Sequence, residues 1–227
     1  MNYGKKSVKQ KKKALQSTSS KLGRKCLLTF SKVLLLCVIA IGIIGICAGL
    51  GVFKGIIDSA PTITLEDATP TRYSSFIYDS KGNQMAKLIA EDSNRVPVTM
   101  DQIPTDLANA FVAIEDERFY QHNGIDIMGI LRAGVTAVKT GFKRQEGAST
   151  ITQQLIKNTV LTTWTQEKTL GERIKRKVQE QYLAIQLEKD TNDKSKILEQ
   201  YMNTINLGQN TLGVQAASKR YFNKNVW

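Results

Sequence analysis

Residues 113–126, AIEDERFYQHNGID, place three carboxylates beside two aromatic side chains. Glu115 directly follows the apolar Ile114, which a purely solvated acidic helix end does not explain. Phe119 and Tyr120 are placed to wall in a nearby carboxylate, and loss of hydration raises the pKa of a carboxyl group and makes its anion a better base. Glu115 is therefore a candidate general base, with the solvated polar side of a helix as the simpler alternative.

A second segment, EGASTITQQLIKN at residues 146–158, is rich in hydroxyl and amide side chains. A serine at a helix start is typical of an N-cap, which is the simpler interpretation of Ser149. Capping does not explain the density of such groups, which suit the binding of sugar hydroxyls. Lys157 ends the run and supplies a point charge for a phosphate. The candidate sugar-binding residues are Ser149, Thr150, Gln153 and Gln154.

A third segment, ERIKRKVQEQYLAIQLE at residues 172–188, combines cations with a carboxylate. Arg173, Lys177 and Glu180 share one face of a helix. Arg176 and Glu180 have the spacing of an exposed i, i+4 ion pair, worth ~0.3–0.5 kcal/mol. This segment alone favours the exposed pair; the functional alternative is that its cations hold an anionic leaving group, with Glu180 as a second carboxylate.

The three segments together change the balance between these alternatives. Two carboxylates from different helices, a hydroxyl and amide patch and a cationic helix face suit the transfer of a glycosyl group that carries a phosphate leaving group. The base, the stabilisation of the leaving group and the positioning of the sugars are then all supplied.

The elements that must position these residues are mostly helices. Residues 74–90 predict a hairpin around a turn at 79–83. From Pro104 the apolar spacing becomes helical, with Leu107, Phe111 and Ile114 facing a core. Further helices are expected over 125–141, 149–161, 172–188, 196–203 and 213–221. The apolar stripe of 125–141 consists of Ile127, Leu131 and Val135. The apolar stripe of 172–188 consists of Ile174, Val178 and Ile185.

The N-terminal part of the chain predicts a membrane anchor. Residues 33–53 form a run of 21 residues without charge, and ~20 apolar residues cross a bilayer as a helix. The net charge of +12 is concentrated before this run, where residues 1–32 hold ten Lys or Arg and no acid. The basicity therefore indicates a cytoplasmic tail and not a nucleic-acid-binding surface, and it places the residues from about 58 onward outside.

This pattern divides the chain into four parts. A basic cytoplasmic tail covers residues 1–32, a transmembrane helix covers 33–55, a stalk covers 56–71, and a mainly α domain covers 72–227. Cys26, Cys37 and Cys47 lie in or beside the anchor, so the outer domain has neither a disulfide nor a thiol nucleophile. His122 has no second His or Cys nearby, which is more typical of a structural histidine than of a metal site.

The chain resembles the peptidoglycan glycosyltransferase domain (glycosyltransferase family 51) of class A penicillin-binding proteins and monofunctional transglycosylases. Five segments carry the resemblance, in the order that the family has. They are EDERFYQHNG (115–124), GASTITQQLIKN (147–158), RKVQE (176–180), ILEQYMNTINLGQ (197–209) and GVQAASKRYFNK (213–224). The match covers roughly residues 72–227, and a preceding transmembrane anchor also fits the family.

The resemblance implies a mainly α, lysozyme-like domain after one transmembrane helix, and lipid II as the substrate. Glu115 would be the base that takes the proton from the acceptor's 4-hydroxyl, so that a β-1,4 bond forms with inversion and undecaprenyl diphosphate leaves. Glu180 would be the second essential carboxylate, on the donor side. Lys157, Arg176 and Lys177 would contact the diphosphate.

The remaining roles also follow from the resemblance. Ser149, Thr150, Gln153 and Gln154 would bind the sugars, and Asn203 lies in a fourth motif that is more structural. A divalent cation, Mg²⁺ or Mn²⁺, would sit at the diphosphate, with no ligands assignable from the sequence. The expected partners are lipid II, the nascent glycan strand, the membrane and a cell-wall synthesis complex, without nucleic acid.

Two alternatives remain open: a lysozyme-like lytic glycosidase, which also uses two carboxylates, and an inactive anchor module that recruits partners. The family continues past YFNK, and the chain shows no Ser-x-x-Lys transpeptidase nucleophile in a plausible setting. We therefore expect the front part of a longer protein.

Overall fold

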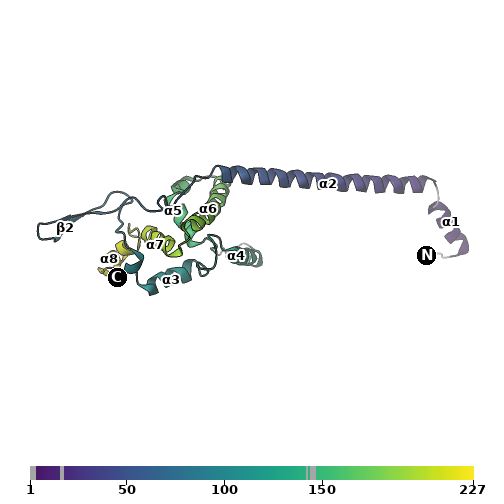
Figure 1. Cartoon of the computed structure of the whole chain (residues 1–227). Helices are drawn as coiled ribbons and strands as arrows, with labels where there is room; N and C mark the ends of the chain where they lie inside the picture. Colours follow the sequence, from purple (N-terminus) through teal and green to yellow (C-terminus); the bar gives the residue numbers. More distant parts are fainter. Residues whose placement is uncertain (1–3, 16–17, 142, 144–146) are drawn as a thin grey trace. The chain divides into compact units, whose positions relative to one another are not determined.

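The computed structural model describes residues 4–15, 18–141, 143 and 147–227 (Figure 1). Parts of the predicted tail, and Glu146 at the start of the hydroxyl and amide segment, lie outside these residues. The chain forms two units, Met1–Gly55 and Ile56–Trp227.

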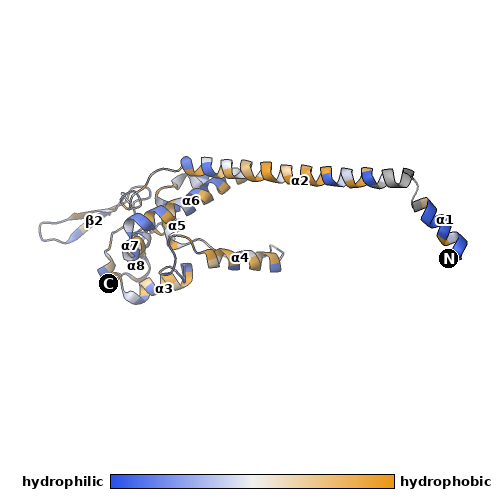
Figure 2. Ribbon diagram, turned by 45° about the vertical axis from the view of Figure 1, so that its right-hand side comes forward, coloured by the Kyte–Doolittle hydropathy of each residue, from blue (hydrophilic) through white to orange (hydrophobic). Residues whose placement is uncertain are grey.

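The first unit is helical. It contains α1 (Lys5–Leu15) and most of α2 (Thr18–Asp58). Within α2, Lys25–Asp58 is long and apolar enough to cross a membrane, and it is the single such helix in the described part of the chain. Its apolar side chains are exposed, and Figure 2 shows the hydrophobic stretch along this helix. Both features fit a single-pass membrane protein. The helix extends beyond the predicted 33–55 because no proline interrupts it on either side.

The second unit is mainly α, as predicted. Its α-helices are α3 (Thr105–Glu115), α4 (Ile127–Lys139), α5 (Ile151–Thr159), α6 (Leu170–Thr191), α7 (Lys194–Thr204) and α8 (Val214–Phe222). Of two short 3₁₀ segments, η1 (Met100–Gln102) precedes α3 and η2 (Thr162–Gln166) lies between α5 and α6.

The predicted hairpin is confirmed. Strands β1 (Ser75–Tyr78) and β2 (Gln84–Leu88) pair antiparallel and project away from the helices (Figure 1). Asp79 holds the turn, because its Oδ1 accepts from the backbone N–H groups of Lys81 and Asn83, each at 2.8 Å. Gly82 adopts a φ of 83° in this turn, a value that glycine reaches without strain.

The core is built around α5, which packs against both α6 and α7. Each of these three helices turns large apolar side chains inward, and Phe119 joins them from the segment after α3. The largest fully buried apolar residues are Phe119, Ile151, Leu155, Ile156, Leu183, Leu187, Ile197, Leu198, Tyr201 and Met202.

Residues 56–71 are not a free stalk. Ile63 and Ala68 are buried in the core of the second unit. The side chain of Gln179 on α6 donates to the backbone carbonyl of Ile56 at 3.3 Å and to Ser59 Oγ at 3.1 Å. Because two apolar side chains and a helix contact hold this segment, the folded domain begins earlier than residue 72.

Two of the predicted buried stripes were only partly correct. On α3, Leu107 and Phe111 pack against the core, but Ile114 is 81% exposed, and the buried residues are Ala108 and Val112. On α6, Ile174 and Ile185 are exposed. The buried face of α6 combines apolar residues with polar side chains that have partners inside the domain, so hydropathy alone does not find it. Those buried residues are Gln179, Glu180, Leu183, Ala184, Leu187 and Glu188.

The stripe on α4 exists but is not covered. Ile127, Leu131 and Val135 lie on one side of the helix, as their spacing predicts, and all three are exposed. The apolar character of α4 is visible in Figure 2.

Candidate active site

Glu115 is the last residue of α3, and its side chain is exposed. The side-chain N–H of Gln154 on α5 donates to Glu115 Oε2 at 3.1 Å. The expected aromatic wall is absent: Phe119 is fully buried in the core and Tyr120 is exposed. The reason is that the helix ends at Glu115 and Asp116 takes φ −161° and ψ 72°, which turns the following residues away from the carboxylate.

Asp116, the neighbour of Glu115, anchors the start of α5. Its carboxylate accepts from the backbone N–H of Ile151 at 3.0 Å and pairs with His122 Nε2 at 2.9 Å. A carboxylate at a helix N-terminus also interacts favourably with the helix dipole. His122 is therefore structural, as its isolation in the sequence indicated; its Nδ1 is buried without a hydrogen-bond partner in the described part of the chain.

The first turn of α5 is capped by Thr150 and not by Ser149. Thr150 Oγ1 accepts from the backbone N–H of Gln153 at 3.2 Å and donates to the carbonyl of Gly124 at 2.8 Å. Gln153 Nε2 reaches the same carbonyl at 3.3 Å. A Cβ on Gly124 would lie 2.5 Å from the backbone of Ala184 on α6, so this close approach requires glycine.

These bonds assign different positions to the four candidate sugar-binding residues. Thr150 and Gln153 are buried and hold the loop at Gly124 to α5. Ser149 and Gln154 are partly exposed. Ser149 Oγ accepts from Lys177 Nζ at 2.7 Å, which joins this segment to α6.

Glu180 lies at the centre of a buried ion-pair cluster. Its side chain is 1% exposed, pairing with Arg176 Nη1 through Oε1 and with Lys177 Nζ at 3.0 Å through Oε2. Arg176 Nε also contacts Glu167 Oε1 at 2.6 Å. Burial alone would lower the pKa of Arg176, but the hydrogen bonds to Glu167 and Glu180 outweigh it and raise the pKa. The interpretation as an exposed surface pair was therefore wrong, and Glu167 was not anticipated.

Lys157 is not part of this cluster. Its ammonium lies 3.8 Å from the centroid of the Trp164 ring in η2, which is a cation–π contact. Lys157 is only partly buried, so its side chain remains accessible to an anionic ligand.

Asn203 is an interior residue of α7 and does not face the site. Its side chain pairs with both backbone groups of Val98, accepting at 2.9 Å and donating at 2.7 Å. Arg95 Nε donates to the backbone carbonyl oxygen of Asn203 at 2.7 Å. These contacts agree with the structural role that the resemblance implies for its motif, and the assignment of Asn203 as a substrate contact stays a prediction.

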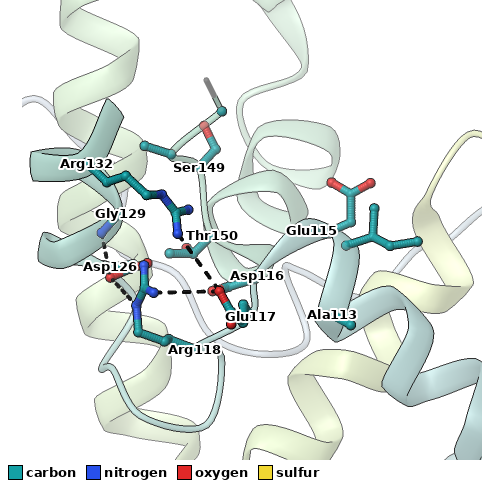
Figure 3. A pocket seen from close by; sticks show the side chains of 13 residues that line it. Ala113, Glu115, Asp116, Glu117, Arg118, Asp126, Gly129, Arg132, Ser149 and Thr150 are labelled. Carbon is teal, nitrogen blue, oxygen red and sulfur yellow. Dashed lines mark hydrogen bonds and ion pairs between the residues drawn. The ribbon is translucent and has the colours of Figure 1, made fainter. Parts of the chain in front are cut away.

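A cavity of about 120 Å³ opens beside Glu115. Figure 3 shows it between the end of α3, the start of α4 and residues 147–150. Arg118 and Arg132 both approach Glu117 Oε2, at 3.8 and 3.9 Å.

Asp126 also lines the cavity. Its Oδ2 contacts Arg118 Nη2 at 2.5 Å, and its Oδ1 accepts from the backbone N–H of Gly129, which caps α4. The sequence patterns did not predict Arg118, Asp126 and Arg132 as residues of this cavity. An aspartate directly before an apolar helical stretch is an N-cap signal that would have indicated Asp126.

The described residues contain no group of three or more His, Cys, Asp or Glu side chains placed to hold a metal ion. A divalent cation at the site therefore stays a prediction from the resemblance.

The sequence model of the transglycosylase family matches residues 81–227. Penicillin-binding protein 1A of Clostridium botulinum (strain Langeland) is 47% identical over 179 residues, which are 78% of this chain and 21% of that protein. Penicillin-binding protein 1A of Clostridium perfringens (strain ATCC 13124) is 40% identical over 221 residues, 96% of this chain and 25% of that protein. The protein of the same name from Streptococcus oralis is 38% identical over 205 residues, 90% of this chain and 31% of its own length.

The chain thus spans about a fifth to a third of the length of these relatives. Since the family match covers well over half of the chain and includes the three segments that build the site, this chain belongs to the transglycosylase family.

Proposed function

We propose that the chain is the glycosyltransferase part of a membrane-anchored penicillin-binding protein and polymerises lipid II into β-1,4-linked glycan strands. One observation carries this proposal. Glu115 and Ser149 line the same cavity, and Ser149 is hydrogen-bonded to Lys177, which also contacts Gln153 and Glu180. An exposed carboxylate and a positioned cation therefore serve a single site.

The exposed Glu115 is the base of the proposed reaction. It takes the proton of the acceptor's 4-hydroxyl as that oxygen attacks the anomeric carbon of the donor. The bond from this carbon to the diphosphate breaks, the configuration inverts, and undecaprenyl diphosphate leaves with the electron pair. Removal of the proton during attack is general-base catalysis, typically worth about 10²–10⁴-fold.

The buried Glu180 positions cations. Because its carboxylate is 1% exposed and bound by Arg176 and Lys177, it does not reach the sugars. It holds Lys177, whose side chain is 40% exposed, beside Ser149, where the ammonium stabilises the negative charge of the diphosphate. A divalent cation would add to this stabilisation, held mainly by phosphate oxygens.

The same observation argues against a lytic glycosidase. Such an enzyme uses two carboxyl groups that flank the scissile bond, and Glu180 is enclosed by its own ion pairs. A glycan leaving group also needs no cation. No observation favours the alternative of an inactive module. Glu115 is exposed beside the cavity, where it is accessible to a substrate.

The proposed surroundings follow from the substrate. We place the basic tail in the cytoplasm and the catalytic domain outside, where the lipid-linked sugars are presented. The nascent glycan strand is the acceptor or donor partner, and a cell-wall synthesis complex is the proposed larger assembly.

The test is incubation of the detergent-solubilised, anchored protein with fluorescent lipid II, followed by gel separation. The proposal expects a ladder of polymer, and it expects none from Glu115→Gln. Shortening of preformed glycan would support the glycosidase, and unchanged lipid II with the wild-type protein would refute an enzymatic role.

A further inference from the structure

We propose that Tyr201 is a positioning residue for the base: it fixes the side-chain amide of Gln154, which in turn holds the carboxylate of Glu115. The inference rests on the proposed function, because it assigns Glu115 the role of base. It adds a residue of α7 to a site otherwise built from α3, α4, α5, α6 and residues 147–150.

The contact runs through one amide. Tyr201 Oη donates to Gln154 Oε1 at 3.3 Å, and Gln154 Nε2 donates to Glu115 Oε2 at 3.1 Å. The three residues lie on α7, α5 and α3, so the chain of hydrogen bonds crosses the domain from its core to the exposed carboxylate.

The orientation of the amide is fixed by its two neighbours. A carboxylate accepts and does not donate, so it requires the N–H side of Gln154. The carbonyl side then faces Tyr201, whose hydroxyl can donate to it. In the reversed orientation two oxygens would face each other at Glu115, which is unfavourable.

Tyr201 is itself packed in the core. It is fully buried, and its ring packs edge-on against Phe111 with centroids 6.1 Å apart. Burial and the nearby charge of Glu115 both raise the pKa of Tyr201, so the hydroxyl keeps its proton throughout the neutral pH range and remains a donor. A rigid donor of this kind limits the rotation of Gln154.

Glu115 needs such support because it is exposed at the end of a helix. An exposed side chain samples several rotamers, and the base acts only when its oxygen is within hydrogen-bond reach of the acceptor hydroxyl. Loss of the Tyr201 hydroxyl therefore lowers the fraction of productive carboxylate without removing any contact to the substrate. The effect falls on kcat and leaves KM nearly unchanged.

The experiment is a double-mutant cycle in the anchored protein, with lipid II polymerisation as the readout. Tyr201→Phe removes one hydroxyl and keeps the ring. It should lower kcat by about 2- to 10-fold, the range expected for one net hydrogen bond, with KM within about 2-fold. In a Gln154→Ala background the same change should have no further effect on kcat, because the connection is already cut.

The matched control is Tyr221→Phe. Tyr221 lies on α8, and its hydroxyl donates to the backbone carbonyl of Leu207 at 2.8 Å. This variant therefore also loses one tyrosine hydrogen bond, away from Glu115. Its kcat should equal that of the wild type.

The possible outcomes separate the claims. Wild-type kcat for Tyr201→Phe, or an equal loss in the Gln154→Ala background, overturns the positioning role. An equal loss of kcat in Tyr221→Phe also overturns it, since the effect would then reflect general stability. Failure of the proposed function is distinct, because the wild-type protein would form no polymer.

Discussion

The ammonium of Lys157 rests on the face of Trp164, 3.8 Å from the ring centroid. This contact places a cation on a partly exposed surface, where it is attracted to the ring with an energy of roughly 0.5–1 kcal/mol. A diphosphate attracts the same ammonium more strongly, so binding of an anionic ligand should draw Lys157 from the ring.

Lys157→Ala should therefore weaken the binding of a phosphoglycolipid inhibitor of moenomycin type. The loss should be larger at low salt, because salt screens exposed charges. In a Trp227→Phe background, Trp164 is the remaining tryptophan, and its emission should change on binding only when Lys157 is present. Unchanged affinity in Lys157→Ala would remove this residue from the site.

Glu115→Gln should abolish polymerisation while lipid II still binds. The amide keeps the size of the side chain and loses the basic oxygen, so turnover should fall by at least ~10²-fold. Steady-state rates and a separate binding titration measure the two effects. Glu117→Gln is a suitable control, as this neighbour is exposed and points to the arginines of the cavity. Wild-type turnover in Glu115→Gln would show that another group is the base.

Asp126 should contribute to the stability of the domain in a pH-dependent way. The hydrogen bond from Arg118 lowers the pKa of Asp126 below its ordinary value of 3.8. A carboxyl group whose pKa is lower in the folded than in the unfolded state stabilises the folded protein. This stabilisation is complete when the pH lies above the pKa of the unfolded state, and it is lost as the pH falls through the pKa of the folded state.

The melting temperature should consequently fall on acidification below about pH 4, and Asp126→Asn should reduce the slope of this fall. Melting curves from pH 3 to 7 measure the effect, with Asp190→Asn on the exposed side of α6 as the control. Parallel slopes for the wild type and Asp126→Asn would contradict the assigned ion pair.

We expect the fusion point after Thr71 to lie outside the cytoplasm, so a fused reporter should be active there only if it works on that side of the membrane. The bias of Lys and Arg toward residues 1–32 favours a cytoplasmic N-terminus. An enzyme that folds only outside the cytoplasm should give signal, and one that requires the cytoplasm should be silent. The reverse pattern would overturn the orientation, and with it access to a substrate presented outside.

Much of the local structure was predictable from the sequence. The turn at Asp79 and Gly82 specifies the hairpin, and the helical period after Pro104 specifies α3, because both depend on hydrogen bonds within a few residues. The uncharged run in α2 likewise determines a helix able to cross a membrane. The motif order alone indicated the family.

The contacts of the site were decided by tertiary structure. The spacing of Arg176 and Glu180 is that of a surface ion pair, yet the packing of α6 against α5 buries Glu180. Lys177, which pairs with Glu180, also finds polar partners in Ser149 and Gln153. Ile114 has the hydropathy of a core residue and lines the cavity instead.

Both differences have one physical cause. Local hydrogen bonding and hydropathy determine which residues form a helix, and these are properties of neighbouring residues. Which face of that helix is buried depends on the partners that segments distant in the sequence bring to it, as Tyr201 and Gln154 bring theirs to Glu115. The sequence by itself determined the elements, the anchor and the family, while only the packing of α3, α5, α6 and α7 decided which side chains meet.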